Sequence, residues 1–319
     1  MGMEVRIAME APDEAAARRA GEAAFAAIAA LDARLSDYRP DSDLRAIERA
    51  APHALQVHPD VFAVLSQAVD VARATHGAFD PTIAPVVVLW REARRSGRLP
   101  APDRLAAARA LVDWSRLHLE KTSGGFFVRL PVAGMRLDLG GIAKGYILQR
   151  AMDTLRDHGI TAALIDAGGD IVAGTPPRSS RGWVAQVGCD VGLAEHVGPA
   201  ELERAKRGPA ELERAKRGRA ELERANNATT VSLANAALAT SGATAQFVVI
   251  DGVRYSHVVD PSTGLGLTSH RTVHVRAPDG ATADAWATAL SVLTDEELWN
   301  VTLPVGVTFC RAGGGWAGG

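Results

Sequence analysis

The chain has few cysteines, no excess of charge of either sign and no long apolar run. Its two cysteines, Cys189 and Cys310, lack the closely spaced partner of a zinc site or a disulfide framework, so we expect both to be small core side chains. A formal net charge of -2 creates no overall field that would attract nucleic acid or an anionic membrane. No stretch reaches the roughly 18 apolar residues of a membrane span. We therefore predict neither a nucleic-acid partner nor membrane insertion.

What remains is the composition of a globular protein, with 47% hydrophobic and 23% charged residues over 319 positions. That length suits one large domain or two closely joined ones. Near the N-terminus, Glu4, Arg6 and Glu10 interrupt what would have to be the apolar core of a signal peptide. We therefore expect a cytoplasmic protein, on the premise that the printed start is the native one.

Helical patterns dominate the first half of the chain. An alternating, strand-like segment over 3–9 precedes an alanine-rich amphipathic stretch over 13–35. Helical patterns recur at 59–75, 83–95 and 102–110, and glycine and proline breakers separate them. The chain thus opens with a strand and continues as helices.

Strand patterns dominate the second half. Residues 117–130 predict two short strands around a Ser-Gly-Gly turn, 135–139 predict a strand that ends at a glycine pair, and 142–158 predict a helix. Further strand-like segments follow that helix at 161–174, 182–190, 254–260 and 271–277. Because helices come early and strands late, the order favours an α+β fold over a regular βαβ alternation.

Residues 198–226 carry an internal repeat. GPAELERAK occurs twice and GRAELERAN follows, at a ten-residue period. That step drifts around a helix of 3.6 residues per turn, so it makes no continuous apolar stripe. We interpret the repeat as a charged surface insertion of broken helical turns or partial disorder, and a role in docking a partner is the alternative.

A glycine-lysine motif, DLGGIAKGY, spans Asp138 to Tyr146. Gly140 and Gly141 let backbone N–H groups approach an anion, the start of the following helix adds partial positive charge, and Lys144 supplies an ammonium group. The pattern indicates a phosphate cradle. It is neither a Walker A loop nor GxGxxG, and a tight turn with a surface lysine explains it equally well.

Two more small-residue motifs follow. In DAGGD, Asp166 and Asp170 flank Gly168 and Gly169, which permit close approach of a ribose or a flat ring, although a hairpin turn alone has the same pattern. The segment 239–242, ATSG, reads as a further loop with hydroxyl groups, among them Ser241.

A carboxylate and a hydroxyl share one face of the helix predicted over 282–290. Asp284 and Thr288 are four residues apart, and such oxygen ligands suit a hard cation such as Mg2+. The alternative is a helix start at which Thr282 or Asp284 is the N-cap.

Three further segments contain polar or aromatic side chains at turns. His257 and Asp260 stand in SHVVDPSTG, where a histidine that titrates near neutrality can take a proton from a hydroxyl, although most strand histidines are structural. Tyr38 in LSDYRPDSDL can stack on a planar ring or anchor the core. Asp80 and Thr82 in GAFDPT form a rigid turn with two side-chain oxygens.

The order of these motifs resembles the ApbE family of FAD:protein FMN transferases. LSxYxPxSxL, GxFDPT before LW, DLGGIAKGY, DAGGDI, ATSG, HVVDPxTG and ADxxATAL follow one another over residues 1 to about 293. The resemblance implies an α+β, two-lobed single domain with a mixed or antiparallel sheet and flanking helices. That domain would span 1–310, contain the repeat insertion at 198–226, and leave 311–319 as a flexible tail.

The resemblance also implies roles for individual residues. Mg2+ would be bound by Asp284, Thr288 and the backbone carbonyl of Ala143. His257, Lys144 and Asp260 would act near the reacting phosphate, with His257 as the candidate base. The residues implied to line the FAD site are Tyr38, Asp80, Thr82, Gly140, Gly141, Lys144, Asp166, Gly168, Gly169 and Ser241.

The reaction implied is transfer of the FMN moiety of FAD to a threonine of a target flavoprotein, with release of AMP. Magnesium and Lys144 would neutralise charge on the pyrophosphate. Two alternative functions involve FAD but no acceptor protein: an FAD pyrophosphatase, or an FAD-binding protein without turnover. A fourth possibility is an interaction protein built around the repeat.

Overall fold

The computed structural model describes residues 3–187, 229–242, 246–269, 271–311 and 317–318. The charged repeat at 198–226 and Cys189 lie outside these residues. No helix in the described ranges is long and apolar enough to span a membrane.

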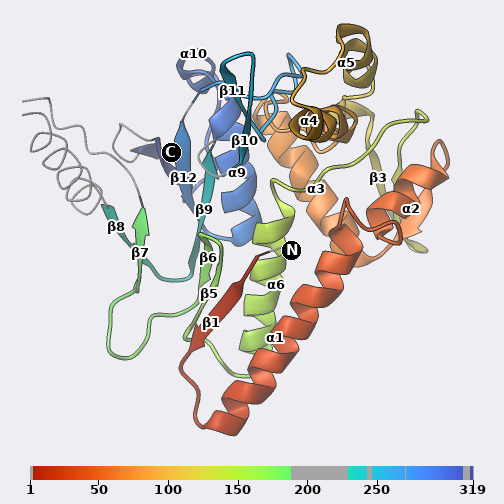
Figure 1. Cartoon of the computed structure of the whole chain (residues 1–319). Helices are drawn as coiled ribbons and strands as arrows, with labels where there is room; N and C mark the ends of the chain where they lie inside the picture. The colour runs from red at the N-terminus through yellow and green to blue at the C-terminus, as the bar shows by residue number, and fades with distance from the viewer. Residues whose placement is uncertain (1–2, 188–228, 243–245, 270, 312–316, 319) are drawn as a thin grey trace, which may run out of the picture.

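Helices and strands alternate in an irregular order (Figure 1). The first half contains β1 (Val5–Met9), α1 (Glu14–Leu35), α2 (Asp43–Ala50), β2 (Leu55–Val57), α3 (Pro59–Ala74), α4 (Ala84–Ser96), α5 (Pro102–Arg109), the 3-10 helix η1 (Trp114–Arg116), β3 (His118–Thr122), β4 (Gly125–Arg129) and α6 (Ala143–Asp157). The second half contains β5 (Ala163–Ala167), β6 (Asp170–Ala173), β7 (Trp183–Val187), β8 (Thr229–Leu233), β9 (Ala236–Gly242), β10 (Phe247–Ile250), β11 (Val253–Ser256), β12 (Thr272–Ala277), α9 (Gly280–Val292), α10 (Asp295–Leu298), β13 (Thr308–Arg311) and β14 (Ala317–Gly318).

A seven-stranded sheet in the order β1-β5-β6-β9-β12-β13-β14 forms the centre of the fold. All of its ladders are antiparallel, which confirms the predicted α+β class. β14 pairs with β13, so residues 317 and 318, which the sequence placed in a C-terminal tail, lie at an edge of this sheet.

The two faces of the sheet are covered differently (Figure 1). Alternate side chains such as Val172, Ala237 and Val273 belong to the main core under α6 and α9, whereas Leu238 and Cys310 belong to a smaller cluster with the β7–β8 pair. Cys310 is fully buried, as expected, but it is disulfide-bonded, so the expectation that it is a simple core side chain is wrong.

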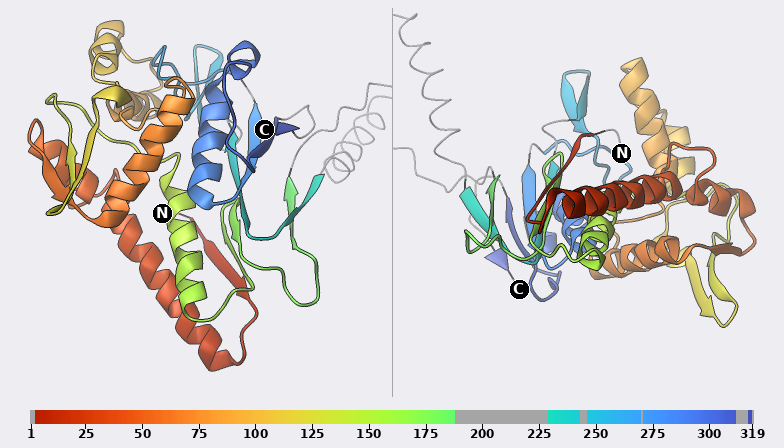
Figure 2. Two further views of the ribbon diagram at one scale, coloured as in Figure 1. Left: turned by 180° about the vertical axis from the view of Figure 1, so that it is seen from behind. Right: turned by 90° about the horizontal axis from the view of Figure 1, so that it is seen from below.

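Helices form a second and a third layer beyond the sheet. α6 packs against both α1 and α9, and α3 packs against α9 (Figure 2). The three-stranded sheet β2-β4-β3 lies against α3, where the rings of Phe62 and Phe126 are 4.9 Å apart.

A separate, smaller core joins α4 and α5 to the β10–β11 hairpin. Trp90 on α4 lies 5.1 Å from the ring of Tyr255 on β11, and its indole N–H donates to the carbonyl of Gly264 at 2.8 Å. The hairpin is thereby fixed to the helical part of the protein rather than to the main sheet.

Most predicted helices and strands are confirmed, and the differences include the following three. Residues 135–139 form no ladder strand, because only an isolated bridge joins Arg136 to Ile83. The ATSG segment at 239–242 lies within strand β9 rather than in a loop. Helix α2 was not predicted, since its eight residues bury only Leu44 and Ile47, too few to establish a helical period.

Helices α6 and α9 cross at a pair of glycines. A Cβ atom on Gly145 would overlap the carbonyl oxygen of Gly280, and one on Gly280 would overlap the carbonyl oxygen of Gly145. Because neither backbone has a side chain here, the first turn of α6 lies directly against the first turn of α9. This crossing decides which residues meet at the candidate site.

Substitution of Gly145 by alanine tests this packing. We expect G145A to lower the free energy of unfolding by about 3 kcal/mol, because the clash is with backbone and cannot be relieved by a rotamer change. Urea denaturation measures the change. The matched control is Gly21→Ala in α1, where a Cβ would meet only the Met9 methyl at 3.7 Å; it should be neutral or stabilise by up to about 1 kcal/mol. Equal effects of the two variants would contradict the packing argument.

Candidate functional site

Lys144 lies in the first turn of α6 and forms an ion pair with Asp170. Asp170 is 3% exposed, and its other oxygen accepts from the backbone N–H of Thr240 at 3.0 Å. Burial lowers the pKa of Lys144, but the charges of Asp284 and Asp170 outweigh it, so the pKa is raised overall. Lys144 is therefore a fixed ammonium group rather than a base.

Asp284 lies in the second turn of α9 and faces the start of α6. It is 5% exposed, and its carboxylate accepts from the backbone N–H of Gly145 at 3.1 Å. Burial raises its pKa to about 7; Lys144 opposes the increase and Asp170 adds to it. Asp284 is not the N-cap of α9, because Asp279 fills that position and accepts from the backbone N–H of Thr282 at 2.9 Å. The capping alternative for Asp284 is thus excluded.

The glycine loop, which contains Gly140 and Gly141, passes directly beside Thr288, one helical turn beyond Asp284. A Cβ on Gly141 would lie only 2.7 Å from the Thr288 hydroxyl oxygen. Ala143 is the first residue of α6 and stands between Gly141, beside Thr288, and Gly145, beside Asp284. Ala143, Asp284 and Thr288, the three residues predicted to bind Mg2+, therefore lie close to one another in the structure.

This oxygen-rich group suits a hard cation. Two buried carboxylates, Asp170 and Asp284, share the single ammonium of Lys144. Asp284 has only backbone N–H donors, from Gly145 and Lys144, and no side-chain donor among the described residues. A carboxylate, a hydroxyl and nearby backbone carbonyl groups are ligands that Mg2+ accepts, with remaining positions left for water or phosphate.

His257 follows strand β11 and is held by its neighbour Gln246. The backbone N–H of His257 donates to the Gln246 carbonyl at 3.0 Å, and the ring Nδ1 lies 3.1 Å from the same oxygen. Because a carbonyl only accepts, Nδ1 carries the proton and Nε2 keeps its lone pair. Burial lowers the His257 pKa, and the charges of Arg94 and Lys144 lower it further. The ring is thus a neutral proton acceptor near pH 7.

A cavity of about 430 Å³ lies at the C-terminal end of α9. Val292, four residues beyond Thr288, belongs to its wall, so the face of α9 that carries Asp284 and Thr288 leads toward it. Its lining also includes His76, Asp80, Trp114, Asp260 and Glu297. The volume suits part of a nucleotide-sized ligand.

Asp80 and Asp260 shape the wall of this cavity through their own loops. Asp80 is buried, which raises its pKa, and accepts from the Thr82 backbone and hydroxyl and from the Trp114 N–H at 2.7, 2.6 and 3.1 Å. Asp260 accepts from the Ser262 N–H at 2.8 Å and from the Thr263 hydroxyl at 2.9 Å. Both carboxylates therefore close turns that form the wall.

The sequence matches the model of the ApbE family over residues 1–304. The chain belongs to the ApbE family. Among curated proteins, the FAD:protein FMN transferase of Treponema pallidum (strain Nichols) is 33% identical over 270 residues, which are 82% of this chain and 68% of the relative. That of Klebsiella pneumoniae (strain 342) is 26% identical over 312 residues, 96% of this chain and 80% of the relative.

Solved structures agree with the fold. The ApbE protein of Thermotoga maritima superposes with a TM-score of 0.77 at 25% identity, covering 99% of this chain and 93% of that one. The flavin transferase ApbE from Vibrio cholerae gives a TM-score of 0.76 at 25% identity, over 98% and 90% of the two chains. The described residues of this chain therefore have the ApbE fold.

The loop over residues 36–42, which carries Tyr38 and is called the tyrosine loop below, is joined to the glycine loop by one arginine of this ApbE-family chain. Tyr38 is 76% exposed, and the guanidinium carbon of Arg91 on α4 lies 4.3 Å from its ring centre. Arg91 also forms ion pairs with Asp37 and, at 3.5 Å, with Asp138. Asp138 in turn accepts from the Gly140 N–H at 2.8 Å. Tyr38 is thus held beside the phosphate-cradle motif.

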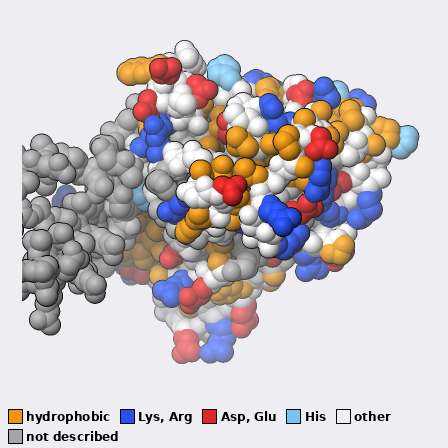
Figure 3. Space-filling model, turned by 45° about the horizontal axis from the view of Figure 1, so that its top comes forward, with side chains coloured by type: hydrophobic (Ala, Val, Ile, Leu, Met, Phe, Trp, Pro, Cys, Tyr) orange, Lys and Arg blue, Asp and Glu red, His pale blue; other side chains and the backbone are white. Residues whose placement is uncertain are grey.

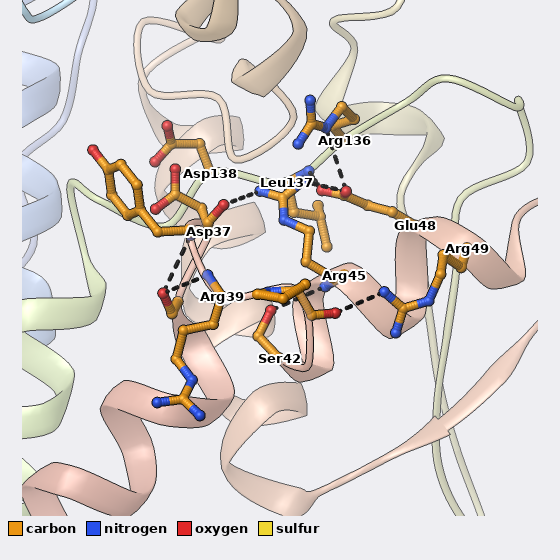
Figure 4. Close-up of polar contacts among 12 residues, drawn as sticks. Asp37, Arg39, Ser42, Arg45, Glu48, Arg49, Arg136, Leu137 and Asp138 are labelled. Carbon is orange, nitrogen blue, oxygen red and sulfur yellow. Dashed lines mark hydrogen bonds and ion pairs between the residues drawn. The ribbon is translucent and has the colours of Figure 1, made fainter. Parts of the chain in front are cut away.

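Helix α2 fixes the same two loops from the other side (Figure 4). Arg45 donates to the Asp37 carbonyl at 2.7 Å and forms an ion pair with Glu48. Glu48 accepts from the Leu137 N–H at 2.9 Å and contacts Arg136 at 3.3 Å. In Figure 4 the carboxylates of Asp37 and Asp138 lie next to one another. The unpredicted helix α2 therefore helps to hold 136–138 in place without a sheet.

The remaining predicted residues support the site from the sheet. Gly168 and Gly169 have φ values of 64° and 96° and turn the chain from β5 into β6, and Asp166 accepts from the Gly169 N–H at 3.0 Å. This turn places Asp170 beside Lys144. Ser241 is buried and donates to Ser291 on α9 at 3.2 Å, so it contacts the helix that carries Thr288.

Sequence reasoning did not assign Asp170, Arg91 or Glu48 to the site. Asp170 stood in the DAGGD motif, but nothing in the sequence joined it to Lys144, 26 residues earlier. Arg91 and Glu48 are charged residues on helices, a pattern that is common on solvated surfaces. Only the fold makes them partners of the two loops.

Replacing Arg91 by alanine should destabilise the junction of the two loops. Burial, and then the charge of Asp37, raise the pKa of Asp138, and Arg91 opposes that increase. Without Arg91, the folded state should lose about 2 kcal/mol at neutral pH, because two neighbouring carboxylates remain without their cation.

The loss of folding stability caused by R91A should become smaller as the pH is lowered. An Asp138 whose pKa is raised on folding binds its proton more tightly in the folded state, so its stabilising contribution is present at low pH and lost as pH rises through the folded pKa. Denaturation at about pH 7 and pH 5 measures this. Arg95→Ala, an exposed position on the same helix, is the control. A deficit that grows at low pH would contradict the assignment.

Proposed function

We propose that this chain transfers the FMN moiety of FAD to a threonine hydroxyl of a target flavoprotein, releases AMP and requires Mg2+. The observation that carries the proposal is the meeting of Lys144, Asp284 and Thr288 at the crossing of α6 and α9. Family membership and the relatives named FAD:protein FMN transferase support the flavin and the protein acceptor.

Magnesium would be held by Asp284, Thr288 and the backbone carbonyl of Ala143. When bound there, it supplies positive charge to the pyrophosphate oxygens. The protein adds the ammonium of Lys144 and the partial positive charge at the N-terminus of α6, where the Lys144 and Gly145 N–H groups donate to Asp284. Asp170 holds Lys144 in place, so its charge is oriented before substrate binds.

The remaining parts of FAD would be held by the cavity and the tyrosine loop. The cavity beyond Thr288 takes one end of the molecule, with walls closed by Asp80 and Asp260. Tyr38 offers an exposed ring face, kept in position by Arg91. Tyr38 is linked to the glycine loop through Arg91 and Asp138, and the cavity lies beyond Thr288, so FAD would extend from one to the other.

The bond changes balance without an additional reactant. The threonine oxygen attacks the phosphorus on the FMN side, a new P–O bond forms, and the pyrophosphate bond to AMP breaks. His257 Nε2 takes the hydroxyl proton, since Nδ1 is engaged with Gln246 and its lowered pKa leaves the ring neutral. Lys144 offsets negative charge on the leaving AMP.

Transfer is tested with purified protein, FAD, Mg2+ and a candidate acceptor. AMP release together with covalent flavin on an acceptor threonine, located by mass spectrometry, supports the proposal. Free FMN and AMP without an acceptor would indicate an FAD pyrophosphatase. Tight binding of intact FAD with no AMP would indicate a binding protein without turnover.

Removing the proposed metal ligands should abolish the response to Mg2+. We expect Asp284→Ala and Thr288→Val to lower the transfer rate by about 100-fold or more at a fixed metal concentration, because the cation loses an oxygen ligand. Titration of the rate with Mg2+ measures the effect. Thr282→Val is the matched control, since that hydroxyl donates to the cap residue Asp279 at 2.7 Å. An unchanged Mg2+ titration in D284A would refute the metal site.

A further inference from the structure

The β10–β11 hairpin stands away from the main sheet, next to the residue proposed as the base (Figure 2). Its turn is Asp251-Gly252, with φ values of 50° and 77°, the two positive values of a type I′ hairpin. Just beyond the pair, Gln246 holds both the backbone and the ring of His257. The strand β10 therefore begins at the His257 contact and runs outward from it.

The pairing register fixes which backbone groups of β10 point away from β11. Ile250 and Val253 flank the two-residue turn and form a hydrogen-bonded pair, so Val249 and Arg254 form a non-hydrogen-bonded pair. The N–H of Ser256, which has the same parity as Arg254, points outward and donates to Leu267 at 2.7 Å. By the same alternation, the N–H and C=O groups of Phe247 and Val249 point outward on the other edge.

That outer edge of β10 has no strand beside it among the described residues. The sheet that contains β10 has two strands, and no hydrogen bond within the described part of the chain reaches the Phe247 or Val249 amides. An edge with outward N–H and C=O groups is a template for a further strand.

The side chains along this edge favour a polypeptide over a small ligand. Phe247 is 45% exposed and Val249 is 56% exposed, and the Arg254 guanidinium lies 3.7 Å from the Phe247 ring centre. The opposite side of the hairpin packs on the Trp90 core, so it is fixed before any partner arrives. In the space-filling view of Figure 3, in which the top of Figure 1 comes forward, hydrophobic side chains lie among charged ones.

We propose that the outer edge of β10 is the docking strand for the acceptor polypeptide, which adds to it in extended conformation and brings its threonine toward His257. This inference rests on the proposed transferase function. Main-chain hydrogen bonds to Phe247 and Val249 would give affinity with little dependence on acceptor sequence, and the apolar side chains would contact alternate acceptor residues. The structure thus assigns the acceptor and FAD to different elements: β10 for the polypeptide, and the α6–α9 crossing for the pyrophosphate.

Val249→Pro tests the docking strand, because proline removes the outward N–H while leaving the β10–β11 hydrogen bonds unaffected. The probe is the acceptor protein that receives covalent FMN in the transfer assay. We expect V249P to raise the KM for that acceptor by about tenfold or more, with the KM for FAD changed far less. Val249→Thr keeps the N–H and should retain an acceptor KM within about threefold of the original.

A second measurement uses the original protein and so does not depend on the variant folding. Acceptor peptides that span the flavinylated threonine are N-methylated at alternate residues in two registers. Docking by strand addition predicts that one register loses transfer and the other keeps it, because only alternate amides of an added strand face β10.

The outcomes separate the two proposals. If the original protein releases no AMP and labels no acceptor, the transferase function itself fails. If it labels the acceptor but V249P has an unchanged acceptor KM, or both methylated registers react equally, the docking strand is wrong and the function stands. A V249P protein that is unfolded by circular dichroism leaves the decision to the methylated peptides.

Discussion

The approach of Gly145 to Gly280 is the contact on which the candidate site depends. Two helices normally pack 8–10 Å apart because side chains separate them. Here the missing Cβ atoms let the start of α6 lie directly against the start of α9, so that a carboxylate on one helix accepts from a backbone amide of the other. The same approach brings the glycine loop against Thr288. A larger residue at either position would separate the groups that the chemistry needs together.

Charge is the second constraint, and it follows from the first. The crossing buries Asp284 near Asp170, and among the described residues Lys144 is the cation that they share. Two carboxylates and one ammonium leave a net negative charge in a buried place, which is costly unless a cation or a proton compensates it. This cost of burying the ionised carboxylate raises the pKa of Asp284 to about 7. A bound divalent cation would offset this negative charge. It would thereby allow an anionic pyrophosphate to bind beside the two carboxylates.

The sequence was sufficient for the parts of this protein that depend on local periodicity. The long helices, the β3–β4 hairpin and the i, i+4 placement of Asp284 and Thr288 all follow from spacing alone. It was insufficient where a residue acts through a distant partner. Asp170 meets Lys144 only because β6 and α6 are neighbours in space, and Glu48 reaches Leu137 across 89 positions. The segment 135–139 was mistaken for a sheet strand because its extended backbone is satisfied by Glu48 and by Pro81, not by a ladder.

The candidate site combines buried, rigid elements with exposed ones. This arrangement would let it accept both a nucleotide and a protein. The groups that would meet phosphate lie on α6 and α9, which are buried against the main sheet and cannot shift without disturbing the core. The elements that would meet larger partners stand at its rim: Tyr38 on a loop, and β10 on a hairpin with its own small core. Because Trp90 and Arg91 are consecutive on α4, one helix supports both, the hairpin through Tyr255 and the tyrosine loop through Asp37. A change in α4 would therefore displace both the loop that carries Tyr38 and the β10–β11 hairpin, while leaving the Asp284 carboxylate in place.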